Sequence, residues 1–247
     1  DVQTQHHIYN PYPFFEPEAN GEKTFAWPRG QSLQWVKDAA TYEVSTVASN
    51  VSFPRLAVVQ SLANHDPDVD AIYRMTRKLP LSFSKTETIV VPPKGTFTPW
   101  NAQAVLIHHP AFFGMLLPIT VTGRVSDIWR SYITTRLLWE TDYRVAFSSP
   151  VVTQLRNPHS YQRDLEDEKD LYFRTDFLLT TLADWTSNKC ERLDDAYLDL
   201  IKVLVDVGIL ADPDLGLASA WVADLRDIGY EWPKIVQRLP RFSPRLQ

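Results

Sequence analysis

Short apolar runs separated by polar turns occupy the first 150 residues, which is the pattern of a buried sheet. The runs are LAVVQSL at 56–62, TIVV at 88–91, AVLI at 104–107 and YRVAF at 143–147. They are shorter than helices of globular proteins usually are, so we expect each to form a strand. The Pro- and aromatic-rich segment over 1–30 is expected to be extended and to lie against the core.

Longer segments with apolar residues at helical spacing separate these runs. Asp66 is expected to cap a helix that begins at the next residue, and Ser126 to cap a helix over 127–140. Two shorter helical pieces are predicted after Ser32 and over 109–113.

The pattern changes near Asn157, where the short runs give way to long segments of helical period. We expect three amphipathic helices after it, with Asp214 as the cap of the last: 165–185, 194–210 and 215–228. The chain therefore predicts an α/β fold, with a mixed-sheet fragment over 1–160 followed by a helical C-terminal subdomain over 161–247.

Composition and charge narrow the class of protein. A hydrophobic share of 44%, with 12% aromatic residues, indicates a folded chain. The formal net charge of −5, without a Lys/Arg run, argues against nucleic acid and anionic membrane surfaces as partners. No apolar stretch approaches the ~20 residues of a membrane-spanning helix. Cys190 is the only cysteine, which excludes an intrachain disulfide and a Cys-based zinc site.

A Pro/Gly-rich turn, PPKGTFTPWN at 92–101, joins two of the predicted strands. In α/β enzymes such turns hold ligands at the strand ends. Gly95 and Thr96 would let backbone N–H groups approach a ligand, and Lys94 offers a point charge for phosphate. A tight turn between strands explains the same residues without a ligand.

Three acids, Asp66, Asp68 and Asp70, stand at the start of the first predicted helix. A helix N-terminus stabilises carboxylates, and this alone explains Asp66 and Asp68. The functional interpretation is that one or more of them accept hydrogen bonds from sugar hydroxyls. Asp-x-Asp spacing is also found where carboxylates hold a divalent cation against a diphosphate.

Several ordered segments together resemble a known family. They are DPDVDAIYRMTR at 66–77, VPPKGTFTPWNAQAVLIHHPAFFGMLLP at 91–118, SDIWRSYITTRLLWE at 126–140 and EDEKDL at 166–171. These segments resemble the STELLO family of Golgi glycosyltransferase-like proteins. They are more distantly similar to the reversibly glycosylated polypeptides, the UDP-arabinopyranose mutases. The resemblance extends from about Asn10 to Leu171.

The resemblance implies a GT-A-like (Rossmann-like) fold, of which residues 1–160 would form the C-terminal half. The implied activity is transfer of a sugar from a nucleotide-sugar donor to a glycan or glycoconjugate acceptor. The implied location is the Golgi lumen, in a type II membrane protein anchored upstream of this chain. The sequon at Asn50 agrees with a lumenal glycoprotein. In the resembling families the metal-binding acids lie upstream of the segment matching 10–15, so any Mn²⁺ or Mg²⁺ would be held there and no metal site is assigned to this chain.

The resemblance also suggests roles for single residues. In GT-A folds a carboxylate placed like Asp127 often binds the acceptor or acts as general base. Trp129 and Arg130 nearby suit sugar stacking and phosphate binding. Arg29 lies in a segment similar to the one whose arginine carries the sugar in reversibly glycosylated polypeptides, and it is suited to a diphosphate. The alternatives are a helix-terminal acid for Asp127 and a surface arginine for Arg29.

Two other functions stay open. The chain can be a non-catalytic scaffold or regulator of other glycosyltransferases. The upstream position of the family's metal-binding acids favours this function, whereas the expected strand-end cleft with Asp, Arg, Lys and Trp side chains argues against it. It can also be a sugar-binding module without turnover, which would bind carbohydrate but not nucleotide.

The six histidines contain no pair with the i, i+4 spacing of a zinc site.

Overall fold

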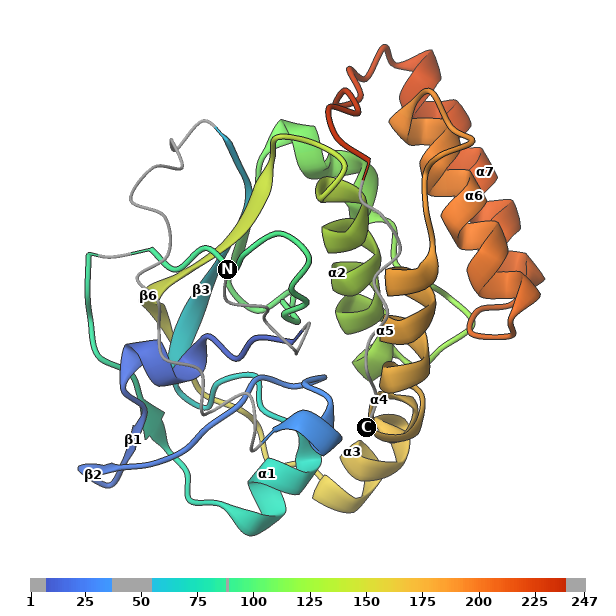
Figure 1. The fold of residues 1–247 in the computed structure, drawn as a ribbon. Coiled ribbons are helices and arrows are strands. Elements are labelled where there is room, and N and C mark those ends of the chain that lie inside the picture. Colours follow the sequence, from blue (N-terminus) through green and yellow to red (C-terminus); the bar gives the residue numbers. More distant parts are fainter. Residues whose placement is uncertain (1–7, 37–54, 88, 239–247) are drawn as a thin grey trace.

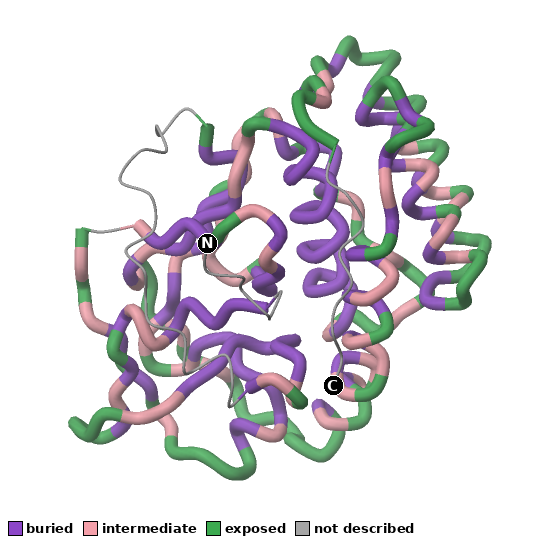
Figure 2. The backbone as a smooth tube through the Cα atoms, in the orientation of Figure 1, coloured by how far each residue is buried: buried purple, intermediate pink, exposed green. Residues whose placement is uncertain are grey.

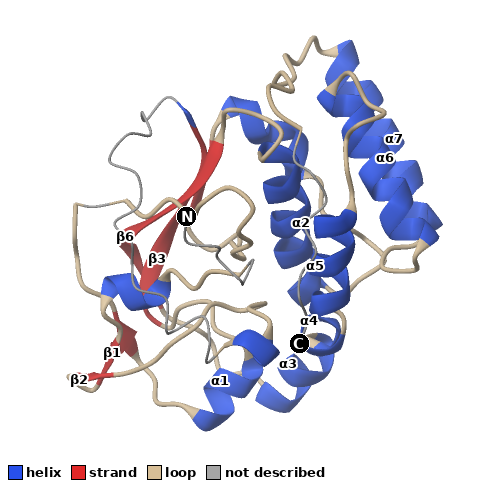
Figure 3. Ribbon diagram, in the orientation of Figure 1, coloured by secondary structure: helices blue, strands red, loops and turns tan. Residues whose placement is uncertain are grey.

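The computed structural model describes residues 8–36, 55–87 and 89–238. In this part of the chain a small mixed sheet is flanked by long helices (Figure 1, Figure 3). The strands are β1 (Glu18–Ala19), β2 (Glu22–Lys23), β3 (Leu56–His65), β4 (Leu81–Ser82), β5 (Val105–Ile107) and β6 (Arg144–Gln154). The mixed α/β character expected from the sequence is therefore confirmed.

The sheet is built around β3, and its order is β2-β1-β4-β3-β5 with β6 paired to β3. The β3–β6 pair is parallel, with Val58 opposite Val145 and Gln60 opposite Phe147, whereas β4 and β5 pair with β3 in the antiparallel sense. The first five residues of β3 are all buried, as expected for a strand covered on both faces.

Seven α-helices and three 3₁₀ helices have bounds within the described ranges. They are α1 (Ala71–Thr76), α2 (Gly123–Leu138), α3 (Tyr161–Asp167), α4 (Lys169–Phe173), α5 (Thr175–Asp184), α6 (Leu193–Asp206), α7 (Asp212–Asp227), η1 (Tyr12–Phe15), η2 (Leu33–Trp35) and η5 (His109–Met115). No helix among these described residues is long and apolar enough to cross a membrane.

Helix α2 lies between the sheet and the C-terminal helices and is the most deeply buried helix (Figure 2). Every residue from Val125 to Leu138 is buried. Its polar side chains therefore need partners inside the protein. Ser131 donates to the carbonyl of Ile128 at 2.6 Å, and Thr135 accepts from the indole of Trp100 at 3.2 Å.

The main hydrophobic core is one cluster that extends from Ile8 to Tyr230. It includes Val58 of β3, residues along α2, and the inner sides of α5 to α7. A second, smaller cluster contains Val59, which points to the other face of the sheet because side chains alternate along a strand. Core packing thus continues across residue 160, and the boundary between the two predicted subdomains stays a prediction.

Three of the four predicted strands form, as β3, β5 and β6. Strand β6 continues to Gln154, well past its predicted end. The run at 88–91 was expected to be a strand, but its described residues make only an isolated bridge, between Val90 and Phe147. The two prolines that follow, Pro92 and Pro93, cannot donate ladder hydrogen bonds, which explains why pairing stops there.

The first helix begins at Ala71, so the prediction that Asp66 caps it was wrong. Asp70 is the cap, and its carboxylate accepts from the Tyr73 N–H at 2.7 Å. The residues between form a turn in which Asp66 pairs with Arg74 instead. The cap is thus Asp70, the acid that directly precedes the first apolar turn of the helix.

Helix α2 begins earlier than predicted, so Ser126 lies inside it and donates to the Gly123 carbonyl at 3.3 Å. The helix expected over 165–185 is broken into α3, α4 and α5. Glu168 stands at the first break with its carboxylate fully buried, and Arg174 stands at the second. The turn at Glu168 delivers its carboxylate to partners outside this segment, which a straight helix would not do.

The remaining helix predictions are close to the structure. Helices α6 and α7 are confirmed within a few residues, and the short pieces after Ser32 and over 109–113 form η2 and η5. Asp214 is not the cap of α7. It lies in the first turn after the cap Ala211, and its carboxylate accepts from the Ile119 N–H at 2.7 Å.

Candidate functional site

A cluster of charged side chains forms where four segments meet. These are the turn around Arg29, the turn after β3 that leads into α1, the first turns of α2, and the segment from the end of β6 to α3. Because strand β3 ends at this place, the cluster occupies a strand-end position of the kind that carries ligands in α/β proteins. We call it the Arg29 cluster.

Arg29 lies at its centre and binds two carboxylates. Its Nε donates to both oxygens of Asp68, at 3.0 and 3.1 Å, and its Nη2 donates to both oxygens of Asp127, at 3.1 and 3.0 Å. Its Nη1 donates to the Arg124 carbonyl. The side chains of Arg29, Asp68 and Asp127 are 8%, 6% and 11% exposed. The guanidinium thus fixes two nearly buried acids in one orientation.

Arg29, Asp68 and Asp127 form a triad of opposite charges, and these charges shift the pKa values of Arg29 and Asp68. Burial alone would lower the pKa of Arg29, but Asp68 and Asp127 raise it well above the ordinary range of arginine. Burial alone would raise the pKa of Asp68, but Arg29, and then Arg156, lower it below its ordinary value. Arg29 is therefore charged, and Asp68 is ionised at neutral pH.

A more exposed layer lies over the triad. Arg156 contacts Asp66 and Asp68, each at 3.4 Å, and its side chain is 22% exposed. Asp66 also pairs with Arg74, whose Nη2 donates to the Pro67 carbonyl at 2.9 Å. Burial, and then Arg74, lowers the pKa of Arg156. Arg156 and Arg124, each with a side chain that is 22% exposed, are the cations of this cluster that solvent reaches most readily, and of these two Arg156 contacts Asp68.

Asp70 and Glu168 form the deepest layer of the cluster. The second oxygen of Asp70 accepts from the Trp27 indole at 2.6 Å. Glu168 accepts from the Ala71 N–H at 2.8 Å and from Arg124 Nε at 2.8 Å. Burial raises the pKa of Asp70 from 3.8 to about 6. These acids hold the start of α1 in place, and neither is directed toward solvent.

The three acids of the Asp-x-Asp-x-Asp run do not converge on one point. Asp66 is directed to Arg74 and Arg156, Asp68 to Arg29, and Asp70 to Trp27 and the α1 N-terminus. Among the described residues, no group of three His, Cys, Asp or Glu side chains is arranged to hold a metal ion. The acids present therefore do not fit the diphosphate-bound cation of a GT-A site.

The turn with Lys94, Gly95 and Thr96 lies near the other end of α2. Lys94 donates to the Thr141 carbonyl at 2.7 Å and to the Gln237 amide oxygen at 3.3 Å. Burial, and then Arg144, lowers the pKa of Lys94. Gly95 has a φ of 82°, the left-handed region that glycine adopts without strain. The structure does not bring this turn together with Arg29.

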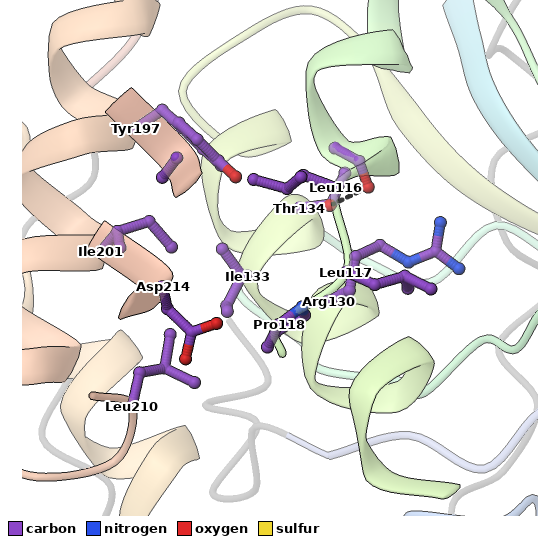
Figure 4. Close-up of a pocket in the computed structure, with 12 residues that line it drawn as sticks. Leu116, Leu117, Pro118, Arg130, Ile133, Thr134, Tyr197, Ile201, Leu210 and Asp214 are labelled. Atoms are coloured by element: carbon purple, nitrogen blue, oxygen red, sulfur yellow. Dashed lines mark hydrogen bonds between the residues drawn. The ribbon is translucent and has the colours of Figure 1, made fainter. Parts of the chain in front are cut away.

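Trp129 and Arg130 are also occupied within the protein. Trp129 is fully buried, and Arg174 lies over its ring at 5.5 Å. Arg130 stacks on Trp100 at 4.2 Å and borders a cavity of about 20 Å³ between α2 and the C-terminal helices (Figure 4). That volume holds about one water molecule. Burial lowers the pKa of Arg130 to about 10, although Asp127 opposes the shift.

Sequence analysis missed Arg156, Arg124, Glu168 and Trp27. Glu168 belongs to the EDEKDL segment used for the family resemblance, and this was the one signal that pointed to it. Arg156 follows the exposed end of β6, and nothing in the local sequence separates it from other surface arginines. The predicted glycosylation site Asn50 lies outside the described residues.

Comparison with known proteins identifies relatives of the chain. Residues 124–243 match the model of the family described as STELLO glycosyltransferases. The chain is 33% identical over 234 residues to "Probable glycosyltransferase STELLO2" of Arabidopsis thaliana and 31% identical over 234 residues to "Probable glycosyltransferase STELLO1" of the same plant. Each alignment covers 93% of this chain, which spans 29% of the length of each relative.

Proposed function

The chain belongs to the STELLO glycosyltransferases, and we propose that it helps to transfer a sugar from a nucleotide-sugar to a glycan or glycoconjugate acceptor in the Golgi lumen. The family follows from the match of residues 124–243 to the STELLO model and from the alignment of 93% of the chain with STELLO proteins. The Arg29 cluster is the proposed site. One observation carries this assignment. Four distant segments place Asp127, Asp68, Arg29 and Arg156 together at the end of the central strand.

Asp127 is the proposed acceptor-binding residue. Arg29 holds both of its carboxylate oxygens, and the Ala102 N–H donates to Oδ2 at 3.2 Å, so the group is fixed before an acceptor arrives. A fixed carboxylate can orient an acceptor hydroxyl and take its proton as the hydroxyl attacks the sugar. Arg29 is the positioning residue for this carboxylate.

Arg156 is the proposed contact for the donor diphosphate. It is the more exposed of the two arginines that contact Asp68. The leaving nucleotide gains negative charge in the transition state, and a nearby cation stabilises that charge more than it stabilises the bound donor. Lys94 does not share this role, because its ammonium group is bound at the other end of α2.

The test is the rate of sugar transfer by the full-length protein with an Asp127→Asn substitution. We expect kcat to fall by roughly 10²–10⁴-fold, since the substitution keeps the shape and removes the base. The matched control is Asp206→Asn on the surface of α6, where the Asp206 side chain pairs with Lys202 and is 57% exposed. Asp127→Asn activity within a few-fold of this control would contradict the assignment.

A second candidate function is a non-catalytic scaffold or regulator of other glycosyltransferases. The observation that favours it is the internal pairing of the cluster, in which Arg29 donates to Asp68, to Asp127 and to the Arg124 carbonyl. Such a network can be purely structural. In that case the full-length protein would bind no nucleotide-sugar, and Asp127→Asn would change the stability of the protein without any change in a transfer rate.

The type II Golgi topology and glycosylation at Asn50 are further proposals from the family resemblance. Expression of the full-length protein in animal cells tests both. The expected result is Golgi staining, together with a glycosidase-sensitive mass that Asn50→Gln removes. Cytosolic staining without such a mass would contradict them.

A further inference from the structure

A groove opens at the opposite end of α2 from the Arg29 cluster. Its volume is about 690 Å³, within the ~300–1,000 Å³ range of small-molecule sites. Asp142 and Tyr143, which follow α2, form one wall, and the C-terminal segment from Glu231 to Val236 forms the other. At a rise of about 1.5 Å per residue, roughly 16 Å of helix separates Asp127 from the helix end at Leu138.

The C-terminal wall is held firmly against the end of α2. The N–H groups of Val236 and Gln237 both donate to the Glu140 carbonyl, at 2.9 and 3.2 Å. The Tyr230 hydroxyl donates to the His109 carbonyl at 2.9 Å. In Figure 1 this segment is the red coil that follows α7 and returns to the top of α2. The groove is therefore formed before any ligand binds, which lowers the entropy cost of binding.

Aromatic rings line part of the groove. Trp232 stacks on Phe113 with ring centroids 5.5 Å apart and an angle of 25°, so packing fixes the orientation of the indole. Tyr143 stands on the facing wall. Fixed aromatic rings supply apolar contact area to the C–H faces of sugar rings at little conformational cost.

The polar rim carries both signs of charge in equal number. Arg55 and Lys234 are cations, Asp142 and Glu231 are anions, and all four side chains are exposed. Asp142 pairs with Arg55 across the rim. Such a rim offers many hydrogen-bond donors and acceptors with no net charge. It therefore suits a neutral ligand rich in hydroxyl groups better than a phosphate or a uronic acid.

We propose that this groove is a binding site for a neutral oligosaccharide, separate from the Arg29 cluster. The inference rests on the proposed function only for its biological sense, because a protein that acts on glycans has a use for a second glycan contact. The binding itself depends on the groove alone. A failure of transfer activity and a failure of this site are therefore distinguishable.

The experiment is ligand-observed NMR titration of the full-length protein with two neutral probes, maltotetraose and β-1,4-mannotetraose. We expect saturable binding of at least one, with a Kd on the order of 1 mM or tighter. Asp142→Ala with Glu231→Ala should weaken it at least about fivefold, because two exposed hydrogen-bonding groups are lost. Both residues are exposed, so the double variant is expected to fold.

Three matched measurements make the result specific. Glu22→Ala, in an exposed ion pair with Lys78 on the far edge of the sheet, should leave Kd unchanged. Asp127→Asn should also leave Kd unchanged, even if it abolishes transfer. Tetragalacturonate and inorganic phosphate should bind more weakly than the neutral probes. Absence of saturable binding, equal binding by the groove variant, or preference for the anionic probes would each overturn the proposal.

Discussion

Arg136 and Glu140 form a fully buried ion pair at the end of α2, with 2.7 Å between Nη1 and Oε1 and no exposed side-chain surface on either residue. Arg136 also donates to the carbonyls of Leu182 and Trp185, at 2.9 and 2.8 Å, and Glu140 accepts from Ser187 at 2.9 Å. The pair thus joins the end of the central helix to the last turn of α5 and to the chain that follows it.

Removing one partner of this pair should destabilise the protein strongly. Glu140→Ala leaves the Arg136 guanidinium buried without its counter-ion, and we expect a loss of roughly 3–5 kcal/mol in the free energy of unfolding. Urea denaturation measures it. The control is Asp206→Ala, whose exposed pair with Lys202 should contribute less than about 1 kcal/mol. Equal effects would mean that the buried pair adds nothing beyond a surface pair.

Gly114 and Thr134 predict a steric coupling between η5 and α2. A Cβ atom added at Gly114 would lie 2.3 Å from Thr134 Oγ1 and 2.4 Å from its Cγ2. Gly114→Ala should therefore cost about 1–3 kcal/mol of stability, and a Thr134→Ala background should relieve only part of this cost, because the Cβ atom of residue 134 stays 2.9 Å from the added Cβ. Gly123→Ala, with nothing within 4 Å of the added Cβ, is the control and should be nearly neutral. A Gly114→Ala cost that is the same in both backgrounds would exclude the clash.

Because the pKa of Asp70 is raised in the folded protein, we expect its contribution to the free energy of unfolding to fall as pH rises. Its pKa is 3.8 when unfolded and about 6 when folded, so the folded state binds the proton more tightly. The stabilisation is complete below pH 3.8 and is lost as pH rises through about 6. At about 1.4 kcal/mol per pKa unit it amounts to at most roughly 3 kcal/mol. Asp70→Asn should remove this slope, measured as the unfolding free energy of parent and variant between pH 4 and 7.

Asp68 provides the opposite sign and hence the control for Asp70. Its pKa is lowered by Arg29 against the effect of burial, so its stabilisation is present above the unfolded pKa and is lost as pH falls through the folded value. The difference between parent and Asp68→Asn should therefore shrink on acidification, whereas that for Asp70→Asn should change in the other direction. Slopes of the same sign would contradict the two assignments.

Local sequence predicted most elements but not the connections between them. The buried strand at β3 and the helices α2, α6 and α7 follow from periodicity, which reports what one segment buries. The break at Glu168 depends on Arg124 and on the α1 N-terminus, which are distant in sequence. The period of 165–185 therefore reads as a single helix, and only tertiary partners reveal the turn.

The candidate site shows the same division. The residue types at Arg29, Asp68 and Asp127 were recognised from sequence, and the structure joins them. Lys94 and Arg29 were both expected to face the donor diphosphate, because both are cations suited to phosphate. Residues 88–91 form no strand within the described part of the chain, so the Lys94 turn packs at the far end of α2 instead. The sequence of one apolar run does not show in which direction its strand crosses the sheet, and this direction decides at which edge of the sheet the following turn lies.

Arg156 supplies the test that separates ligand binding from structural support. Its side chain is 22% exposed and contacts Asp66 and Asp68 at 3.4 Å, so its loss should change stability by about 1 kcal/mol or less. If it contacts the donor diphosphate, Arg156→Gln should raise KM for the nucleotide-sugar roughly tenfold or more, since a charge-assisted hydrogen bond contributes about 1.5–3 kcal/mol. The matched control is Arg163→Gln on exposed α3, which should leave KM unchanged. Equal KM values for the two variants, measured by steady-state release of the nucleotide, would show that Arg156 only neutralises the acids beneath it.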